Sequence, residues 1–176
     1  MAISMYSSSV PVFVRMLGNL STWLDKAAAH AEARKFEPTV LLNARLYPDM
    51  LPLSAQVQIA CDSAKAGVAR LAGVEIPKHE DTEKTVAELK ARIAKTLDFI
   101  KSVPAAQIDG TEARVITIPR RTKEPLVLSG EVFLKHYALA NLYFHVTTAY
   151  AILRHNGLDV GKGDYLGIQP TDLATA

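Results

Sequence analysis

This sequence has little of several features on which particular folds and functions depend. Its 176 residues contain a single cysteine, Cys61, which excludes an internal disulfide framework and a zinc cluster built from cysteines. Neither sign of charge dominates, because 20 Lys and Arg residues are balanced by 18 Asp and Glu residues, and this argues against a nucleic-acid partner. No run reaches the ~20 apolar residues of a membrane span, and the first residues do not read as a secretion signal. We therefore expect a cytoplasmic protein without a membrane or nucleic-acid partner.

Motifs that identify familiar chemistry are missing as well. The five histidines form no H-E-x-x-H, E-x-x-H or H-x-x-x-H pair. No G-x-S-x-G nucleophile motif is present, and Gly161-Lys162-Gly163 lacks the flanking strand and helix of a phosphate-binding loop. His79 stands in a polar loop, where we expect it to be solvated. The sequence thus favours neither a hydrolase nor a nucleotide-binding protein.

Apolar residues recur every three or four positions in three stretches, which predicts amphipathic helices. The expected bounds of these helices are about 7–34, 50–72 and 82–103, with a short helical piece at 39–46. Asp49 is the expected cap of the second long helix, with Pro52 in its first turn and Gly73 as its stop. Thr85 and Glu88 have the spacing of a capping box and give a rival start for the third.

After residue 112 the periodicity changes to that of short strands. Two β-branched runs, within 113–119 and 125–129, flank a polar segment with Arg120 and Arg121, which predicts a small hairpin with a solvated tip. Residues 158–176 are rich in glycine, and we expect them to lie along the helices without regular structure.

The most apolar stretch, Ala138 to Asn156, belongs to a predicted fourth helix that begins at the N-cap Ser129. Most of its circumference is apolar, so we expect it to be buried among the other helices. One face is polar, however, because steps of three and four place Asn141, His145 and Thr148 above one another. Burying these groups unpaired would cost roughly 1–3 kcal/mol each, so they need partners from another helix, water or a ligand.

Four helices of this length, the last one buried, are typical of an all-α antiparallel four-helix bundle. We expect a single domain that spans residues 1–176. The hairpin is then a small insertion before the last long helix.

A candidate site arises if the start of the second helix faces the middle of the fourth. A carboxylate on one imidazole nitrogen of His145 would orient the ring and leave the other nitrogen for a metal, a water or a substrate proton. The candidate ligand-binding residues of this pocket are Asp49, Gln56, Asn141, His145 and Thr148. His145 and Asp49 are the candidate metal ligands, although catalytic zinc ordinarily has three protein ligands. The alternative is a structural protein in which His145 only satisfies hydrogen bonds of the core.

Three segments carry a family resemblance: PDMLPL at 48–53 with QVQ at 56–58, RLAG at 70–73, and ALANLYFHVTTAY at 138–150 followed by ILRHNG at 152–157. They resemble the bacterial family catalogued as domain of unknown function 1993, over nearly the whole chain from Tyr6 to Gly167. That family is similar to the DinB/YfiT-like bundles, a group described as metalloenzymes, many of them dimeric and some acting as thiol-dependent transferases. The resemblance implies a DinB-like bundle and a homodimer, with a transferase as the third functional reading.

The same resemblance bears on the metal. Metal-binding members of the wider group are similar in one histidine near the start of the second helix and two histidines four residues apart on the fourth. His145 matches one of these positions, whereas Asn141 and Ala149 stand four residues to either side, and Asp49 is the nearest candidate for the missing ligand. The resemblance implies a divalent ion such as nickel or zinc only through His145 and Asp49. It identifies no catalytic residues. Trp23 of the first helix is either a dimer contact or a core residue.

Overall fold

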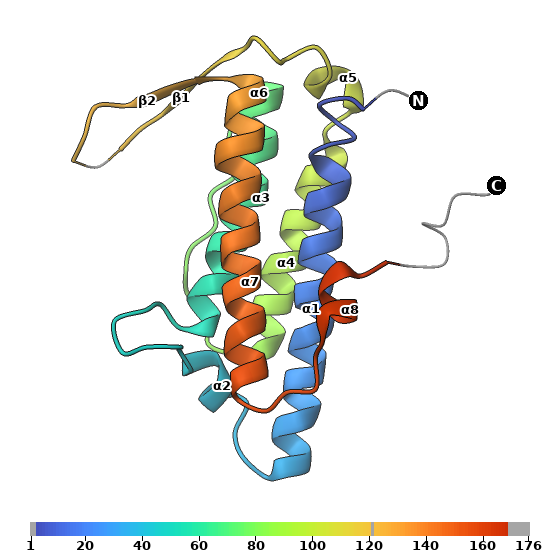
Figure 1. Ribbon diagram of the computed structural model, residues 1–176, viewed down its shortest axis with the longest axis vertical. Helices are drawn as coiled ribbons and strands as arrows, with labels where there is room; N and C mark the ends of the chain where they lie inside the picture. Colours follow the sequence, from blue (N-terminus) through green and yellow to red (C-terminus); the bar gives the residue numbers. More distant parts are fainter. Residues whose placement is uncertain (1–2, 121, 169–176) are drawn as a thin grey trace, which may run out of the picture.

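The computed structural model describes residues 3–120 and 122–168. Its long helical segments are α1 (Val10–Arg34), α3 (Leu53–Ala72), α4 (Val86–Ser102) and a continuous rod made of α6 (Gly130–Val132), the π-helical η1 (Phe133–Ala138) and α7 (Leu139–His155). These helices lie side by side along the long axis of the molecule (Figure 1). α3 packs against α7, α4 and α1, and α1 also contacts α4 and α7. The molecule is therefore largely helical, as its sequence predicts.

The shorter elements lie at the ends and edges of the long helices. They are α2 (Thr39–Asn43), α5 (Ala105–Ile108), β1 (Val115–Ile118), β2 (Leu126–Ser129) and α8 (Lys162–Leu166). β1 and β2 pair antiparallel, with Val115 opposite Ser129 and Ile118 opposite Leu126. This hairpin projects sideways from the end of the molecule at which α6 begins (Figure 1). The predicted hairpin is confirmed, while Arg121 of its tip lies outside the described residues.

Apolar side chains from all the long helices form the core. Trp23 is only 1% exposed, and its ring stacks on Tyr165 and meets Tyr150 edge-on. The core alternative for Trp23 is therefore correct, and Trp23 cannot be a dimer contact. Cys61 is buried as well.

Several helix starts differ from their predicted positions. α3 begins at Leu53, because Pro52 has an extended backbone with φ −71° and ψ 169° and stands before the helix. Asp49 lies in an exposed turn and caps no helix, so its predicted capping role is wrong. α4 begins at the rival start, where Thr85 and Glu88 form a reciprocal capping box. α2 ends at Asn43 instead of continuing to residue 46.

The C-terminal segment contains a helix that the sequence did not predict. α8 begins where the Asp164 carboxylate accepts a hydrogen bond from the Gly161 backbone N–H at 2.8 Å. Asp164 also forms an ion pair with Lys26 of α1 at 2.6 Å. These contacts fix a short turn of helix against α1, while residues 169–176 of the predicted irregular tail lie outside the described residues.

The last helical rod is less buried than its composition predicts. Its cap is Ser129 as expected, since the Ser129 hydroxyl accepts a hydrogen bond from the Val132 N–H. Leu142, Val146 and Ile152 are buried, but Tyr143 and Phe144 are 39% and 61% exposed. One face of α7 is thus open to solvent. Among the described residues, no helix has the length and apolar character needed to cross a bilayer.

Candidate functional site

The structure brings His145 of α7 and Gln56 of α3 together. His145 Nδ1 and Gln56 Oε1 are 2.8 Å apart. The amide of Gln56 is oriented by its other end, because Nε2 donates a hydrogen bond to the Leu51 carbonyl oxygen at 3.1 Å. An amide oxygen only accepts hydrogen bonds, so Nδ1 of His145 carries the proton. The other ring nitrogen, Nε2, then bears a lone pair.

The His145 side chain is half-buried, and this burial favours the neutral form of the imidazole. Burial lowers the pKa of the imidazole below its ordinary value, because desolvation disfavours the charged ring. Gln56 is neutral and does not offset this effect. The ring is therefore neutral at neutral pH, and Nε2 can accept a hydrogen bond or bind a cation.

Asn141 and Thr148 do not take part in this pair. Asn141 Nδ2 donates to the Tyr137 carbonyl oxygen at 2.7 Å, and the Thr148 hydroxyl donates to the Phe144 carbonyl oxygen at 2.7 Å. Both acceptors lie four residues earlier on the same helical rod, a bond that short polar side chains form readily in helices. The expectation that both groups need partners from outside the helix is therefore wrong.

Asp49 makes no hydrogen bond or ion pair with His145 in the part of the chain that the structure describes. Within those residues, no group of three or more His, Cys, Asp and Glu side chains is placed to hold a metal ion. A single imidazole does not meet the three-ligand requirement of a catalytic zinc site. The residues present do not fit the metal that the DinB-like group implies, so we derive no chemistry through a metal.

An aromatic ring lies beside the imidazole of His145. The Phe144 ring stands perpendicular to the imidazole, with their centroids 5.1 Å apart. Leu51, whose carbonyl holds Gln56, is 50% exposed. The His145 ring is thus partly exposed and has one aromatic ring beside it.

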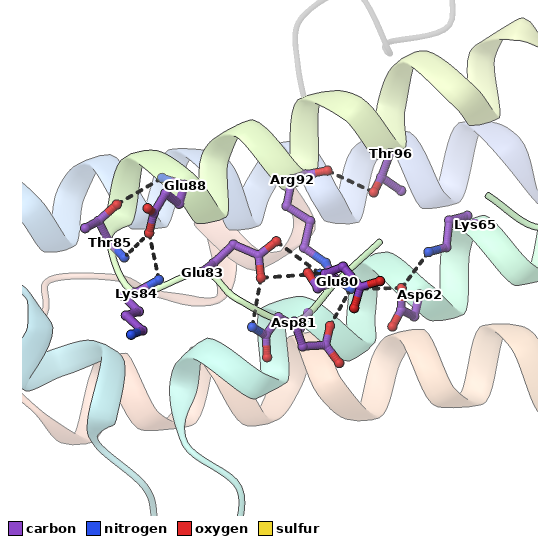
Figure 2. Close-up of polar contacts among 11 residues, drawn as sticks. Asp62, Lys65, Glu80, Asp81, Glu83, Lys84, Thr85, Glu88, Arg92 and Thr96 are labelled. Carbon is purple, nitrogen blue, oxygen red and sulfur yellow. Dashed lines mark hydrogen bonds and ion pairs between the residues drawn. The ribbon is translucent and has the colours of Figure 1, made fainter. Parts of the chain in front are cut away.

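A second polar cluster surrounds Arg92 of α4 (Figure 2). The Arg92 side chain is only 1% exposed, and its Nη2 pairs with Asp62 at 3.0 Å and with Asp81 at 2.9 Å. Its Nη1 donates to Glu83 Oε1 at 3.1 Å and to the Glu80 carbonyl oxygen at 3.0 Å. One guanidinium therefore ties α3, α4 and the segment between them together.

Two further contacts complete this Arg92 network. Lys65 forms an ion pair with Asp62 at 2.9 Å, and Gln58 Nε2 donates to Glu83 Oε2 at 2.9 Å. Burial acts to raise the pKa of Glu83, but the hydrogen bonds from Gln58 and Arg92 outweigh it and hold that pKa below its ordinary value. One feature of the sequence could have indicated this network: Arg92 stands three residues after Leu89, on the apolar face of an amphipathic helix, where a charged side chain needs partners.

The largely helical fold, with its small hairpin before the last helical rod, is that of a DinB-like protein. The chain belongs to the family described as domain of unknown function (DUF1993), whose model matches residues 5–166. A crystal structure of a DinB family member protein from Shewanella denitrificans is similar, with 48% sequence identity and a TM-score of 0.86. That similarity covers 94% of this chain and 93% of the other. No curated protein matches the chain. The family resemblance seen in the sequence is thus confirmed.

Proposed function

We propose that the protein binds a small molecule at the His145–Gln56 pair, and that this ligand has an apolar body and one hydrogen-bond donor. The proposal depends on the 2.8 Å contact between His145 Nδ1 and Gln56 Oε1, which directs a neutral Nε2 lone pair to the ligand. A hydroxyl or amine would donate to Nε2, while the Phe144 ring would contact the apolar body. A single directional polar group beside aromatic surface is a common feature of small-molecule sites.

The same geometry supports binding better than catalysis. A base that accepts a proton becomes an imidazolium, and Gln56 has no charge to stabilise that cation. Cys61 offers no nucleophile, because burial raises the pKa of its thiol to about 12. A role for His145 as a proton acceptor therefore needs a ligand that itself supplies the compensating charge.

Phenol is a suitable probe, because it combines an apolar ring with one hydroxyl donor. We expect phenol to give a saturable binding response in calorimetry and to change the His145 ring ¹⁵N signals of labelled protein. A His145→Phe variant should lose the calorimetric response. The matched control is His155→Phe at the exposed end of the same helix, which should keep it. A response that is absent, or that persists in His145→Phe, would contradict the proposal.

The described residues do not supply a third metal ligand to His145 and Asp49. Protein purified without a histidine tag should therefore contain no stoichiometric nickel or zinc, and added zinc should leave the melting temperature unchanged. A zinc-dependent rise in melting temperature that disappears in His145→Phe would instead support a metal site at His145. It would also support the hypothesis that the protein is a transferase.

We also infer that the long helices form an antiparallel four-helix bundle within one domain, residues 1–176. The packing of α1 on α4, α4 on α3, α3 on α7 and α7 on α1 supports this arrangement. Limited proteolysis should then leave one protected core and release no stable half of the chain.

The second candidate function is that of a dimer-forming protein. Residues 137–153 contain no Asp, Glu, Lys or Arg, although Tyr143 and Phe144 of this stretch are exposed. The same face of a second copy would meet it without bringing like charges together. Sedimentation should show a species of twice the 19.2 kDa chain mass, and Phe144→Glu should dissociate it. Val127→Glu, which changes an equally exposed apolar residue of the hairpin, should not. Sedimentation of the unmodified chain as a monomer would exclude the dimer.

A further inference from the structure

A cleft of about 430 Å³ lies between residues 78–83 and α4, apart from the His145–Gln56 pair. Its polar lining includes Lys78, His79, Glu80, Glu83, Arg92 and Lys95. The volume falls in the range of small-molecule sites. Part of the Arg92 network therefore forms a wall of this cleft.

Three buried polar atoms among the described residues lack a hydrogen-bond partner, and all three belong to residues that line this cleft. They are Nδ1 and Nε2 of His79 and Nε of Arg92. Arg92 is only 4% exposed as a residue, so its Nε–H cannot instead be satisfied by bulk water. Buried polar groups nearly always have partners, and an unpaired one calls for an explanation. That all three belong to residues lining one cleft points to a binding partner at this place.

The remaining lining groups indicate the chemistry of that partner. The carboxylates are already engaged: Glu80 pairs with Lys78, Glu83 binds Arg92 and Gln58, and Glu88 accepts from the backbone N–H groups of residues 84 and 85. Lys95 has no ion pair or hydrogen bond within the described part of the chain. The unused groups are mainly N–H donors, so they fit a ligand rich in acceptors.

We propose that this cleft binds a small carboxylate, which accepts hydrogen bonds from Arg92 Nε–H, the His79 ring and the Lys95 ammonium, and that binding is coupled to uptake of one proton by His79. This function goes beyond the one proposed at His145 and does not depend on it.

The coupling to a proton follows from the charges around His79. The charged groups that face its imidazole are Asp62 and Lys65 of α3 and Arg92 and Lys95 of α4, with Lys78 and Glu80 adjacent on its own segment. Burial, followed by the charges of Lys65, Lys95 and Arg92, lowers the pKa of His79. Without a bound anion, the His79 ring is therefore neutral and has one N–H. A bound carboxylate would favour the imidazolium, in which both ring nitrogens are donors.

Binding also requires the segment to adjust, because the three unpaired atoms are closed off from solvent. Residues 74–80 form no helix or strand. The segment is attached to Arg92 through Asp81, Glu83 and the Glu80 carbonyl, so a local shift of His79 need not break these contacts.

Benzoate is the probe, with benzamide as its neutral counterpart of the same shape. We expect benzoate to perturb the ring ¹⁵N signals of His79 saturably, and to bind more tightly at pH 6 than at pH 8, by up to about tenfold per pH unit, because one proton is taken up. Calorimetry in buffers of different ionisation enthalpy should register that proton. Benzamide should bind more weakly and without the pH dependence.

Variants test the named residues. Lys95→Met should weaken benzoate binding about fivefold or more, an amount typical of a lost charge-assisted contact, whereas Lys101→Met on the same helix should have no effect. His79→Phe, checked for a native circular dichroism spectrum, should abolish the pH dependence. Equal affinity at pH 6 and pH 8, equal binding of benzamide, or a crystal soaked in benzoate that shows only water at His79 and Arg92 would each overturn the proposal.

Discussion

The two carboxylates that hold the 80–83 segment to Arg92 should differ sharply in their contributions to stability. Asp81 and Glu83 contact the guanidinium at similar distances, 2.9 and 3.1 Å. Their side chains differ in exposure, however, at 62% and 12% respectively. An exposed ion pair contributes about 0–1 kcal/mol, while breaking a buried pair costs about 3–5 kcal/mol. We expect Asp81→Asn to lower the free energy of unfolding by less than about 1 kcal/mol. Glu83→Gln should lower it by about 2–3 kcal/mol, because Gln can keep one hydrogen bond.

Urea unfolding at pH 7, followed by circular dichroism, measures both changes. Glu80→Gln is the control, since its carboxylate pairs with Lys78 and both side chains are largely exposed; it should leave the stability unchanged. Equal losses for Asp81→Asn and Glu83→Gln would refute the reasoning, because burial would then not decide the contribution of this network. A loss below about 0.5 kcal/mol for Glu83→Gln would show that desolvation cancels the pairing.

Three further predictions concern pH, capping and backbone conformation. The pKa of Glu83 is lower in the folded protein than its ordinary value of 4.5, so its stabilising effect is complete above that value and is lost as the pH falls below it. Wild type and Glu83→Gln should accordingly approach equal stability in urea titrations at pH 3. Thr85→Ala should destabilise the protein by about 1 kcal/mol in thermal or urea unfolding, because the Thr85 hydroxyl accepts from the Glu88 N–H at 3.2 Å; an unchanged stability would mean that solvent caps α4 equally well. Gly73→Ala should cost about 1–2 kcal/mol, since Gly73 has a φ of +71° and ends α3; a neutral or stabilising effect would contradict the left-handed conformation.

Local patterns were sufficient for most of the helical layout and for the hairpin. The capping box at Thr85 and the N-cap at Ser129 are signals within four residues, and both are confirmed. Local patterns are not sufficient for α8, because its Asp164 not only accepts from the nearby Gly161 N–H but also pairs with Lys26, which lies 138 residues earlier. The start of α3 was misplaced because an Asp before Met50 resembles a cap, whereas the extended conformation of Pro52 delays the helix.

The candidate site was predictable in part. The polar face of the last helix singled out His145, and the pairing of the second and fourth long helices suggested Gln56, which the structure places against it. The predicted contact between Asp49 and His145 is not formed, because the position of a turn residue depends on the path of the chain between Ala44 and Leu53. His79 was expected to be solvated, yet its ring nitrogens are buried. The burial of His79 depends on Arg92, which attaches the loop to α4 through the Glu80 carbonyl and Asp81. Arg92 lies more than ten residues after His79, so the sequence around His79 does not reveal this contact.

The most direct test of the proposed ligand site is the tautomer of His145 in solution. Long-range ¹H–¹⁵N correlation spectra of the histidine rings at pH 7 distinguish a protonated nitrogen from one that bears a lone pair. We predict that His145 is neutral, with the proton on Nδ1 and the lone pair on Nε2, and that Gln56→Met weakens this preference. A proton on Nε2, or a charged ring at pH 7, would show that Gln56 does not present His145 to a ligand.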